Sequence, residues 1–177
     1  MLDAPRVSVF IATSMDGYIA RRDGSLDWLT GPAGTEDYGY GRFMETVDAV
    51  ILGRNTYDAV LGFGAWPFAD KDVHVLTHRP MPGERRAHTH CGPLAPLLEK
   101  LREASVRRVY LDGGKAVQQG LKEGLVHDLT VTVAPVLLGD GIRLFDSGMP
   151  TSDWRTVGVE AFSSGFMQLR WESRRAP

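Results

Sequence analysis

Short apolar strands that end in glycine recur along this chain, and helical patterns follow them. Ala49 to Leu52 is such a run and ends at Gly53, while Arg107 to Leu111 precedes Gly113. Between them, the leucines within 94–101 repeat at intervals of three and four residues, which predicts an amphipathic helix. Alternating strands and helices are typical of a parallel sheet that is covered by helices on both faces.

The remaining segments extend this pattern. Thr35 is the expected N-cap of a first helix, because Glu36 and Asp37 follow it and carboxylates stabilise the positive end of a helix. That helix would present one apolar face, and Asn55 or Thr56 would cap the next helix. The face of the first helix comprises Tyr40, Phe43, Met44 and Val47. Further strands are expected at Arg6 to Thr13, Val73 to Thr77 and Leu129 to Val133, and further helices at Tyr57 to Leu61 and Lys115 to Glu123.

The carboxyl-terminal part alternates between apolar and polar residues. Val157 to Ala161 and Met167 to Trp171 each show a period of two, and Ser163-Ser164-Gly165 between them marks a turn. The predicted fold is therefore α/β, a mixed, mostly parallel sheet flanked by helices with a C-terminal antiparallel hairpin. A chain of 177 residues without a compositional break is expected to form one domain over 1–177.

Charge and composition exclude several functions. Lys plus Arg is 20 and Asp plus Glu is 22, a net charge of −2 that argues against a nucleic-acid-binding surface. A single cysteine, Cys91, excludes an intramolecular disulfide and favours a reducing cytoplasm. The amino terminus does not resemble a cleaved signal, and the apolar runs are too short to span a bilayer, so we expect no membrane partner.

Basic residues follow three of the predicted strands. Arg54 follows Gly53, His78 and Arg79 follow the strand that ends at Thr77, and Lys115 begins a predicted helix. Ligands bind at the carboxyl ends of strands in open α/β sheets, and helix N-termini present free N–H groups to anions. Together these ends predict a dinucleotide phosphate site, although each arginine alone is more simply a surface residue.

Other residues leave alternatives open. His88, His90 and Cys91 are of the types that bind zinc, but in a strand Cys91 points away from the two histidines, so no metal is expected. Trp28, in the long loop from Asp23 to Gly34, and Trp66 either stack on a planar substrate or fill the core.

Several segments resemble a known family over nearly the whole chain, from about residue 6 to 172. They are Ser14 to Ala20, Asp23 to Leu29, Gly53 to Tyr57, Asp112-Gly113-Gly114, Gly124 to Leu129 and Pro135 to Phe145. These segments are similar to the dihydrofolate reductase-like family, which includes the reductase domain of bacterial riboflavin biosynthesis.

The resemblance implies a fold, a cofactor and a homodimer. NADPH would bind where the strands end, and Asp16 to Trp28 would form a mobile loop over the active site. By position, the implied cofactor-binding residues are Ala12, Thr13, Gly53, Arg54, Asn55, Thr56, Thr77, His78, Arg79, Gly113, Gly114, Lys115, Ala116 and Val117. The implied substrate-binding residues are Trp28, Tyr40 and Trp66.

Two departures from the family bear on the substrate. Gly39 stands where a folate reductase has its acid, and the apolar stretch Leu61 to Phe68 replaces the segment that grips a ribose phosphate in the riboflavin reductases. We therefore expect an NADPH-dependent reductase that transfers hydride to a small planar heterocycle or a related carbonyl or imine. Asp37 is the preferred proton donor and Asp16 the second.

Three alternatives remain from the sequence. Two are enzymes: the 5-amino-6-(5-phosphoribosylamino)uracil reductase of riboflavin biosynthesis and dihydrofolate reductase. The third is a nucleotide-binding dimer without catalytic activity, since a fold does not by itself imply a function.

Overall fold

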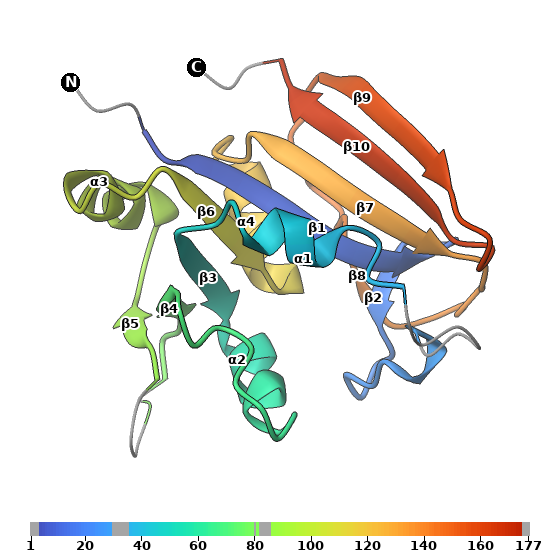
Figure 1. The fold of residues 1–177 in the computed structure, drawn as a ribbon, viewed down its shortest axis with the longest axis horizontal. Coiled ribbons are helices and arrows are strands. Elements are labelled where there is room, and N and C mark those ends of the chain that lie inside the picture. Colours follow the sequence, from blue (N-terminus) through green and yellow to red (C-terminus); the bar gives the residue numbers. More distant parts are fainter. Residues whose placement is uncertain (1–3, 30–35, 80, 82–85, 175–177) are drawn as a thin grey trace.

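The structure, a computed structural model, describes residues 4–29, 36–79, 81 and 86–174. Within these residues eight strands form one sheet in the order β5-β4-β3-β6-β1-β7-β10-β9 (Figure 1). Its strands are β1 (Arg6–Ser14), β3 (Ala49–Gly53), β4 (Asp72–Leu76), β5 (His88–His90), β6 (Arg108–Asp112), β7 (Asp128–Ala134), β9 (Trp154–Ala161) and β10 (Met167–Ser173). A separate two-stranded sheet pairs β2 (Tyr18–Ala20) with β8 (Ile142–Arg143). The helices are α1 (Tyr40–Met44), α2 (Arg54–Leu61), α3 (Leu94–Glu103), α4 (Gly114–Lys122) and the 3-10 turn η1 (Asp27–Leu29).

Strand directions confirm the predicted mixed sheet. β1 lies parallel to β6 and β7, β3 is parallel to β4 and β6, and β4 is parallel to β5. The last strand, β10, runs antiparallel to both β7 and β9. The carboxyl ends of β1, β3, β4, β6 and β7 consequently share one edge of the sheet, where ligands of open α/β sheets bind.

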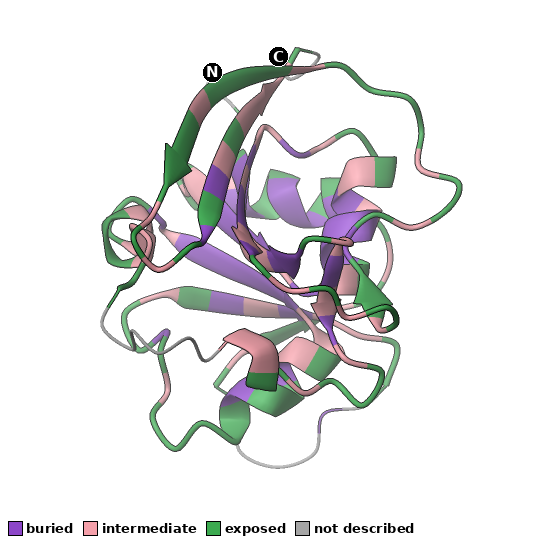
Figure 2. Cartoon of the chain, turned by 90° about the vertical axis from the view of Figure 1, so that its right-hand side faces the viewer, coloured by how far each residue is buried: buried purple, intermediate pink, exposed green. Residues whose placement is uncertain are grey.

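Helices cover both faces because the buried strands are apolar on both sides. Val9, Ile51 and Leu111 belong to the core cluster that includes α3 and α4, whereas Val50 and Leu52 pack with α1 and α2. Figure 2 shows the buried residues along the central strands and the inner sides of the helices. The four leucines of α3 are each at most 7% exposed. Burying one such side chain stabilises the fold by about 1.5–3 kcal/mol.

The first helix is shorter than the sequence predicts. It begins at Tyr40 and ends at Met44, and its N-cap is Gly39 with φ 83°. Tyr38 also has a positive φ, 51°, so the backbone before Tyr40 is not helical. Asp37 and Val47 therefore lie outside the helix, and the expected cap Thr35 lies outside the described residues.

Three short strands and one helix start also differ from expectation. β2, β5 and β8 were not predicted, because segments of two or three residues carry too little periodicity. α2 begins at Arg54 directly after its N-cap Gly53, so neither Asn55 nor Thr56 caps it. No helix among the described residues has the length and apolarity needed to cross a membrane.

Candidate active site

Two uncapped helix N-termini meet at the carboxyl ends of the adjacent strands β3 and β6. α2 follows β3 through Gly53, and α4 follows β6 through Gly113, and neither cap residue supplies a side-chain hydrogen bond. The first N–H groups of a helix have no partner within the helix, and the helix dipole makes that end positive. Two such ends side by side are suited to bind an anion such as a diphosphate.

Gly113 permits this close approach. Its φ of 98° is one that side-chain-bearing residues rarely adopt, and a Cβ added there would clash with Thr56 Oγ1 and lie 3.2 Å from the backbone nitrogen of Gly53. The turn after β6 thus contacts the first turn of α2 directly. Glycine is required at this position because a side chain would not fit between the two helix starts.

The loop after β4 lies against the same helix. The Arg79 guanidinium donates a hydrogen bond to Asn55 Oδ1 at 3.0 Å, and the Arg79 backbone N–H donates to Thr77 Oγ1 at 3.0 Å. His78 lies 3.0 Å from the Cys91 sulfur through its Nδ1 atom. The structure therefore brings the predicted residues Thr77 to Arg79 next to the start of α2.

The other predicted cofactor residues differ in their environments. Arg54 forms an ion pair with Asp58 one turn later in α2, at 2.8 Å. Lys115 is exposed and pairs with Asp146 at 3.6 Å. Ala116 and Val117 bury their side chains in the core, so only their backbone atoms are available at the helix start.

Gly114 makes room for a neighbouring side chain. A Cβ on Gly114 would lie 2.7 Å from Ile19 Cδ1, which packs from β2 against the start of α4. This glycine thus serves the packing of the 14–20 segment on the helix, whereas Gly113 serves the contact with α2.

Asp112 is a half-buried acid that no sequence motif assigns to the site. It is the last residue of β6, on the sheet face that α1 covers, near the aromatic rings of Tyr40 and Tyr110. Although Asp112 is partly accessible, burial of its carboxyl group raises its pKa from 3.8 to about 6, against the hydrogen bond that Gly113 N–H donates to it at 2.8 Å. An acid with this pKa exchanges protons near neutral pH, as a proton donor must.

The aromatic residues around Asp112 form its low-dielectric wall. The Tyr40 ring lies 5.6 Å from Phe10 and 6.2 Å from Tyr110, measured between centroids. Tyr110 donates its hydroxyl hydrogen to the Phe10 carbonyl oxygen at 3.0 Å. Burial, together with the charge of Asp112, raises the pKa of Tyr40 to about 12, so this hydroxyl stays neutral. The signal in the sequence was an acid that closes an otherwise apolar strand, but its burial depends on α1.

Asp16 ties two loops together. Its carboxylate accepts hydrogen bonds from Ser14 Oγ at 2.6 Å, Leu138 N–H at 3.1 Å and Gly139 N–H at 2.7 Å. These bonds, that of Ser14 foremost, lower its pKa to about 2. The Met15 N–H also donates to the backbone after β7. The beginning of the expected mobile loop is therefore held in place, and any mobile part must start later in the chain.

Asp37 performs a similar structural task before α1. Its two carboxylate oxygens accept hydrogen bonds from Gly39 N–H and Gly41 N–H, both at 2.9 Å. These bonds lower the pKa of this exposed carboxylate. Helical spacing predicts Asp37 one turn before Tyr40, but Asp37 precedes the helix and accepts hydrogen bonds from N–H groups at its start.

The predicted tryptophans lie in different settings. Trp66 packs edge-on against Tyr57 and Phe68, with ring centroids 5.8 and 5.5 Å away. Trp28 lies in η1, and its indole N–H is buried without a partner among the described residues. Trp66 thus belongs to the packing beneath α2, while Trp28 retains an unused donor.

Ala12 and Thr13 take opposite faces of β1. Ala12 pairs with Thr132 of β7, on the face that also carries Phe10 and Asp112. Thr13 points the other way by strand alternation and is 4% exposed. Ala12 is thus the small residue in the floor of the site.

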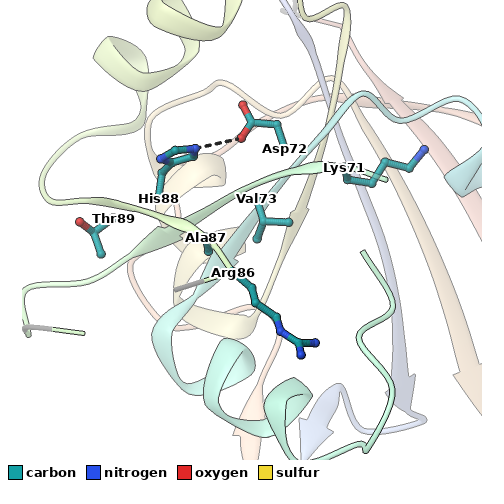
Figure 3. A pocket seen from close by; sticks show the side chains of 7 residues that line it. All are labelled: Lys71, Asp72, Val73, Arg86, Ala87, His88 and Thr89. Carbon is teal, nitrogen blue, oxygen red and sulfur yellow. Dashed lines mark ion pairs between the residues drawn. The ribbon is translucent and has the colours of Figure 1, made fainter. Parts of the chain in front are cut away.

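A cavity of about 590 Å³ lies elsewhere, beside the first residues of β4 and β5 (Figure 3). Its lining includes Lys71, Arg86 and an ion pair between His88 and Asp72 at 3.6 Å. No group of His, Cys, Asp or Glu residues in the described part of the chain could hold a metal ion. This cavity is separate from the carboxyl ends of the strands, where the site described above lies.

Comparison with known proteins identifies relatives over nearly the whole chain. The profile of the RibD C-terminal domain family matches residues 5–67 and 66–168. YwjB of Bacillus subtilis, a protein of unknown function, is 36% identical over 92% of this chain and 95% of its own length. The riboflavin biosynthesis protein RibD of Corynebacterium ammoniagenes is 29% identical over 81% of this chain, which matches only 47% of RibD.

Solved structures share the fold. A Shewanella sp. PV-4 protein named for riboflavin biosynthesis is 34% identical, with a TM-score of 0.87 over 96% of this chain and 99% of that one. Dihydrofolate reductase from Enterococcus faecalis, solved with NADP(H), has a TM-score of 0.67 over 96% of each chain at 16% identity. The second likeness shows the dihydrofolate reductase-like fold alone.

Proposed function

Because the chain belongs to the RibD C-terminal domain family, we propose that it is an NADPH-dependent reductase that transfers hydride to a small planar heterocycle or a related carbonyl or imine. The relatives support a reductase. The use of NADPH and the class of substrate are what we propose for this chain. NADPH supplies the hydride, and the protein positions it and the substrate.

One observation carries the proposal: the uncapped N-termini of α2 and α4 meet beside a half-buried acid. A Cβ on Gly113 would clash with Thr56, so the two helix starts are in contact, and Asp112 directly precedes this turn. The helix starts fit the diphosphate of a dinucleotide, which would bring the nicotinamide to the sheet edge near Ala12. Arg79, fixed on Asn55, is the cation proposed for the 2′-phosphate.

Asp112 is the proton donor that we propose. Hydride transfer to an electrophilic carbon leaves negative charge on the adjacent nitrogen or oxygen, which must receive a proton. The raised pKa of Asp112, about 6, keeps part of this acid protonated near neutral pH. Asp16 and Asp37 have lowered pKa values and bind backbone N–H groups, so they are the weaker assignments for this role.

The reductase reaction of riboflavin biosynthesis is the second candidate, favoured by the family. The stretch 61–68, which begins at the last residue of α2, argues against a phosphorylated substrate. It has no basic residue, and Leu61 and Phe63 are 50% and 63% exposed. Exposed apolar side chains there suit an uncharged substrate. Folate is disfavoured because Gly39 supplies no carboxylate to bind a pterin ring.

A two-step experiment tests the proposal. NADPH binding is measured by fluorescence titration, and NADPH oxidation is then followed with pteridines, dihydrofolate, aromatic imines and the phosphoribosylaminouracil substrate. Saturable binding and turnover of an uncharged heterocycle or imine are expected. Binding without any turnover would favour a non-catalytic nucleotide-binding protein, and lack of binding would contradict the proposed function.

The proton donor is tested on whichever substrate is reduced. Asp112→Asn keeps the shape and the hydrogen bond from Gly113 but cannot deliver a proton, so kcat at pH 5.5 should fall at least ~100-fold. Asp16→Asn and Asp37→Asn are matched controls and should retain the pH dependence of the wild type. A pH-independent loss of less than ~3-fold in Asp112→Asn would exclude Asp112 as the donor.

A further inference from the structure

Thr132 and Gln168 are buried polar side chains on the sheet face that carries the site. Each is 3% exposed. Thr132 of β7 pairs with Ala12 of β1 on one side and with Gln168 of β10 on the other. The three side chains therefore form a row across the sheet beside the small residue that floors the site.

The orientation of the Gln168 amide follows from its partners. Its Nε2 atom donates to the Tyr38 carbonyl oxygen at 2.9 Å, and Arg170 Nη1 donates to its Oε1 atom at 3.4 Å. A carbonyl oxygen can only accept and a guanidinium can only donate, so the amide cannot be flipped.

This orientation determines the role of the Thr132 hydroxyl. The second Nε2 hydrogen of Gln168 points to Thr132 Oγ1 at 3.0 Å, so Thr132 must accept there. The hydroxyl hydrogen of Thr132 has no acceptor among the residues that the structure describes. Because buried donors are almost always paired, this hydroxyl hydrogen is one that an acceptor on a bound ligand could satisfy.

The backbone that accepts this hydrogen bond from Gln168 has an unusual conformation. Tyr38 has φ 51°, and its ring packs against Phe162 and Phe166 with centroids 4.9 and 5.0 Å away. Strained backbone of this kind persists only where surrounding contacts determine it. Gln168 is thus bound by the Tyr38 carbonyl oxygen as well as by Thr132 beside it in the row, which fixes the direction of its second N–H.

Thr132 and Asp112 lie on opposite sides of β1. Strand spacing and rise per residue place their Cα atoms about 12 Å apart, with Ala12 between them. Both side chains stand on the same face of the sheet, so a ligand that bonds both must carry polar atoms at two separate positions. One or two fused rings with a polar atom at each end meet this requirement.

We propose that the Thr132 hydroxyl donates a hydrogen bond to an acceptor on the substrate, and that Gln168 is the positioning residue that turns this hydroxyl towards it. This inference rests on the proposed function and narrows its substrate class. The substrate is a planar heterocycle with a carbonyl oxygen or ring nitrogen at the edge remote from Asp112. Simple aldehydes and ketones, which have one polar atom, cannot engage both ends.

The test uses the full chain saturated with NADP⁺ and the fluorescent heterocycle lumazine, a dioxopteridine with carbonyl and ring-nitrogen acceptors. Thr132→Val keeps the size of the side chain and removes the hydroxyl, so the Kd for lumazine should rise at least tenfold. Thr132→Ser keeps the hydroxyl and should stay within threefold of the wild type. The Kd for NADP⁺ should be unchanged in both variants. Naphthalene, which has no acceptor, is the control ligand, and its affinity should not differ between the variants and the wild type.

Gln168→Glu tests the positioning role. A carboxylate only accepts, so Thr132 would donate its hydrogen to it and lose the free donor. Lumazine binding should weaken as much as in Thr132→Val, while the pH dependence of NADP⁺ binding stays that of the wild type. A thermal melt establishes that each variant is folded.

The outcomes separate this inference from the proposed function. Wild-type lumazine affinity in Thr132→Val, or a Thr132→Ser variant as weak as Thr132→Val, would overturn the role of the hydroxyl. Wild-type affinity in Gln168→Glu would overturn the positioning role. No saturable lumazine binding to the wild type would overturn the substrate class, whereas failure to bind NADP⁺ contradicts the proposed function itself.

Discussion

Replacing Asp112 with Asn should change the stability of the protein in a pH-dependent way. The pKa of Asp112 is raised from 3.8 to about 6 by burial, so the folded protein binds this proton more tightly than the unfolded chain. The free energy of unfolding contributed by Asp112 is therefore complete below about pH 4 and is lost as the pH rises to about 6. A shift of this size corresponds to about 3 kcal/mol, an upper value because Asp112 remains partly accessible.

The assay is urea unfolding of wild type and Asp112→Asn at pH 4.5 and pH 8. The amide retains the acceptor for Gly113 N–H and does not ionise, so the variant should be more stable than the wild type at pH 8 by 1 to about 3 kcal/mol. At pH 4.5 the gain should largely disappear. An equal difference at both pH values would refute the raised pKa and with it the argument for a proton donor.

Asp37→Asn is the control of opposite sign. Backbone hydrogen bonds lower the pKa of Asp37, so its stabilising contribution is present above its ordinary titration range and is lost as the pH falls. Asp37→Asn should therefore be less stable than the wild type at pH 8, with a smaller difference in acid. A variant that gains stability at pH 8 would contradict the capping hydrogen bonds described for this residue.

Three further predictions concern the cofactor and the assembly. Calorimetry should show tighter binding of NADPH than of NADH, and Arg79→Ala should reduce that preference at least tenfold; equal affinities of the wild type would remove Arg79 from the 2′-phosphate site. Gly113→Ala should destabilise the protein by more than about 1 kcal/mol, because the backbone is left-handed and the added methyl group meets Thr56. The affinity for NADPH should fall as well. Gly124→Ala is the control for backbone strain alone, because φ is 69° there but nothing lies within 4 Å of the added group. We propose that the chain forms the homodimer that the family resemblance implies, so sedimentation equilibrium should give twice the mass of 19.5 kDa at micromolar concentration, and a monomer mass would reject it.

The local sequence determines the alternation of strands and helices and the position of the two helix starts at which we propose that the cofactor binds. Apolar runs of four or five residues can be strands only if they are buried, and the glycines after them mark where the chain turns into the next helix. Gly53 and Gly113 could therefore be placed at strand ends from the sequence. The reason for Gly113 is tertiary, because the atoms that exclude a side chain there belong to the start of α2.

The first helix shows where local patterns fail. Tyr40, Phe43 and Met44 have helical spacing, but the N–H groups of Gly39 and Gly41 are satisfied by Asp37 rather than by an extra turn. The carbonyl of Tyr38 is bound by Gln168, which lies 130 residues later in the chain. A contact of that sequence separation leaves no periodicity to detect.

The chemistry of the site was likewise decided by tertiary structure. An acid before two glycines is visible in the sequence, yet only α1 and β1 bring Tyr40 and Phe10 over Asp112 and raise its pKa. The pKa of Asp16 is lowered instead, because the Ser14 hydroxyl and the Leu138 and Gly139 N–H groups donate hydrogen bonds that stabilise its ionised form. The sequence by itself thus determined which segments form the sheet and where the chain turns, while the acidity of each carboxyl group depended on neighbours that only folding brings within hydrogen-bond or van der Waals distance.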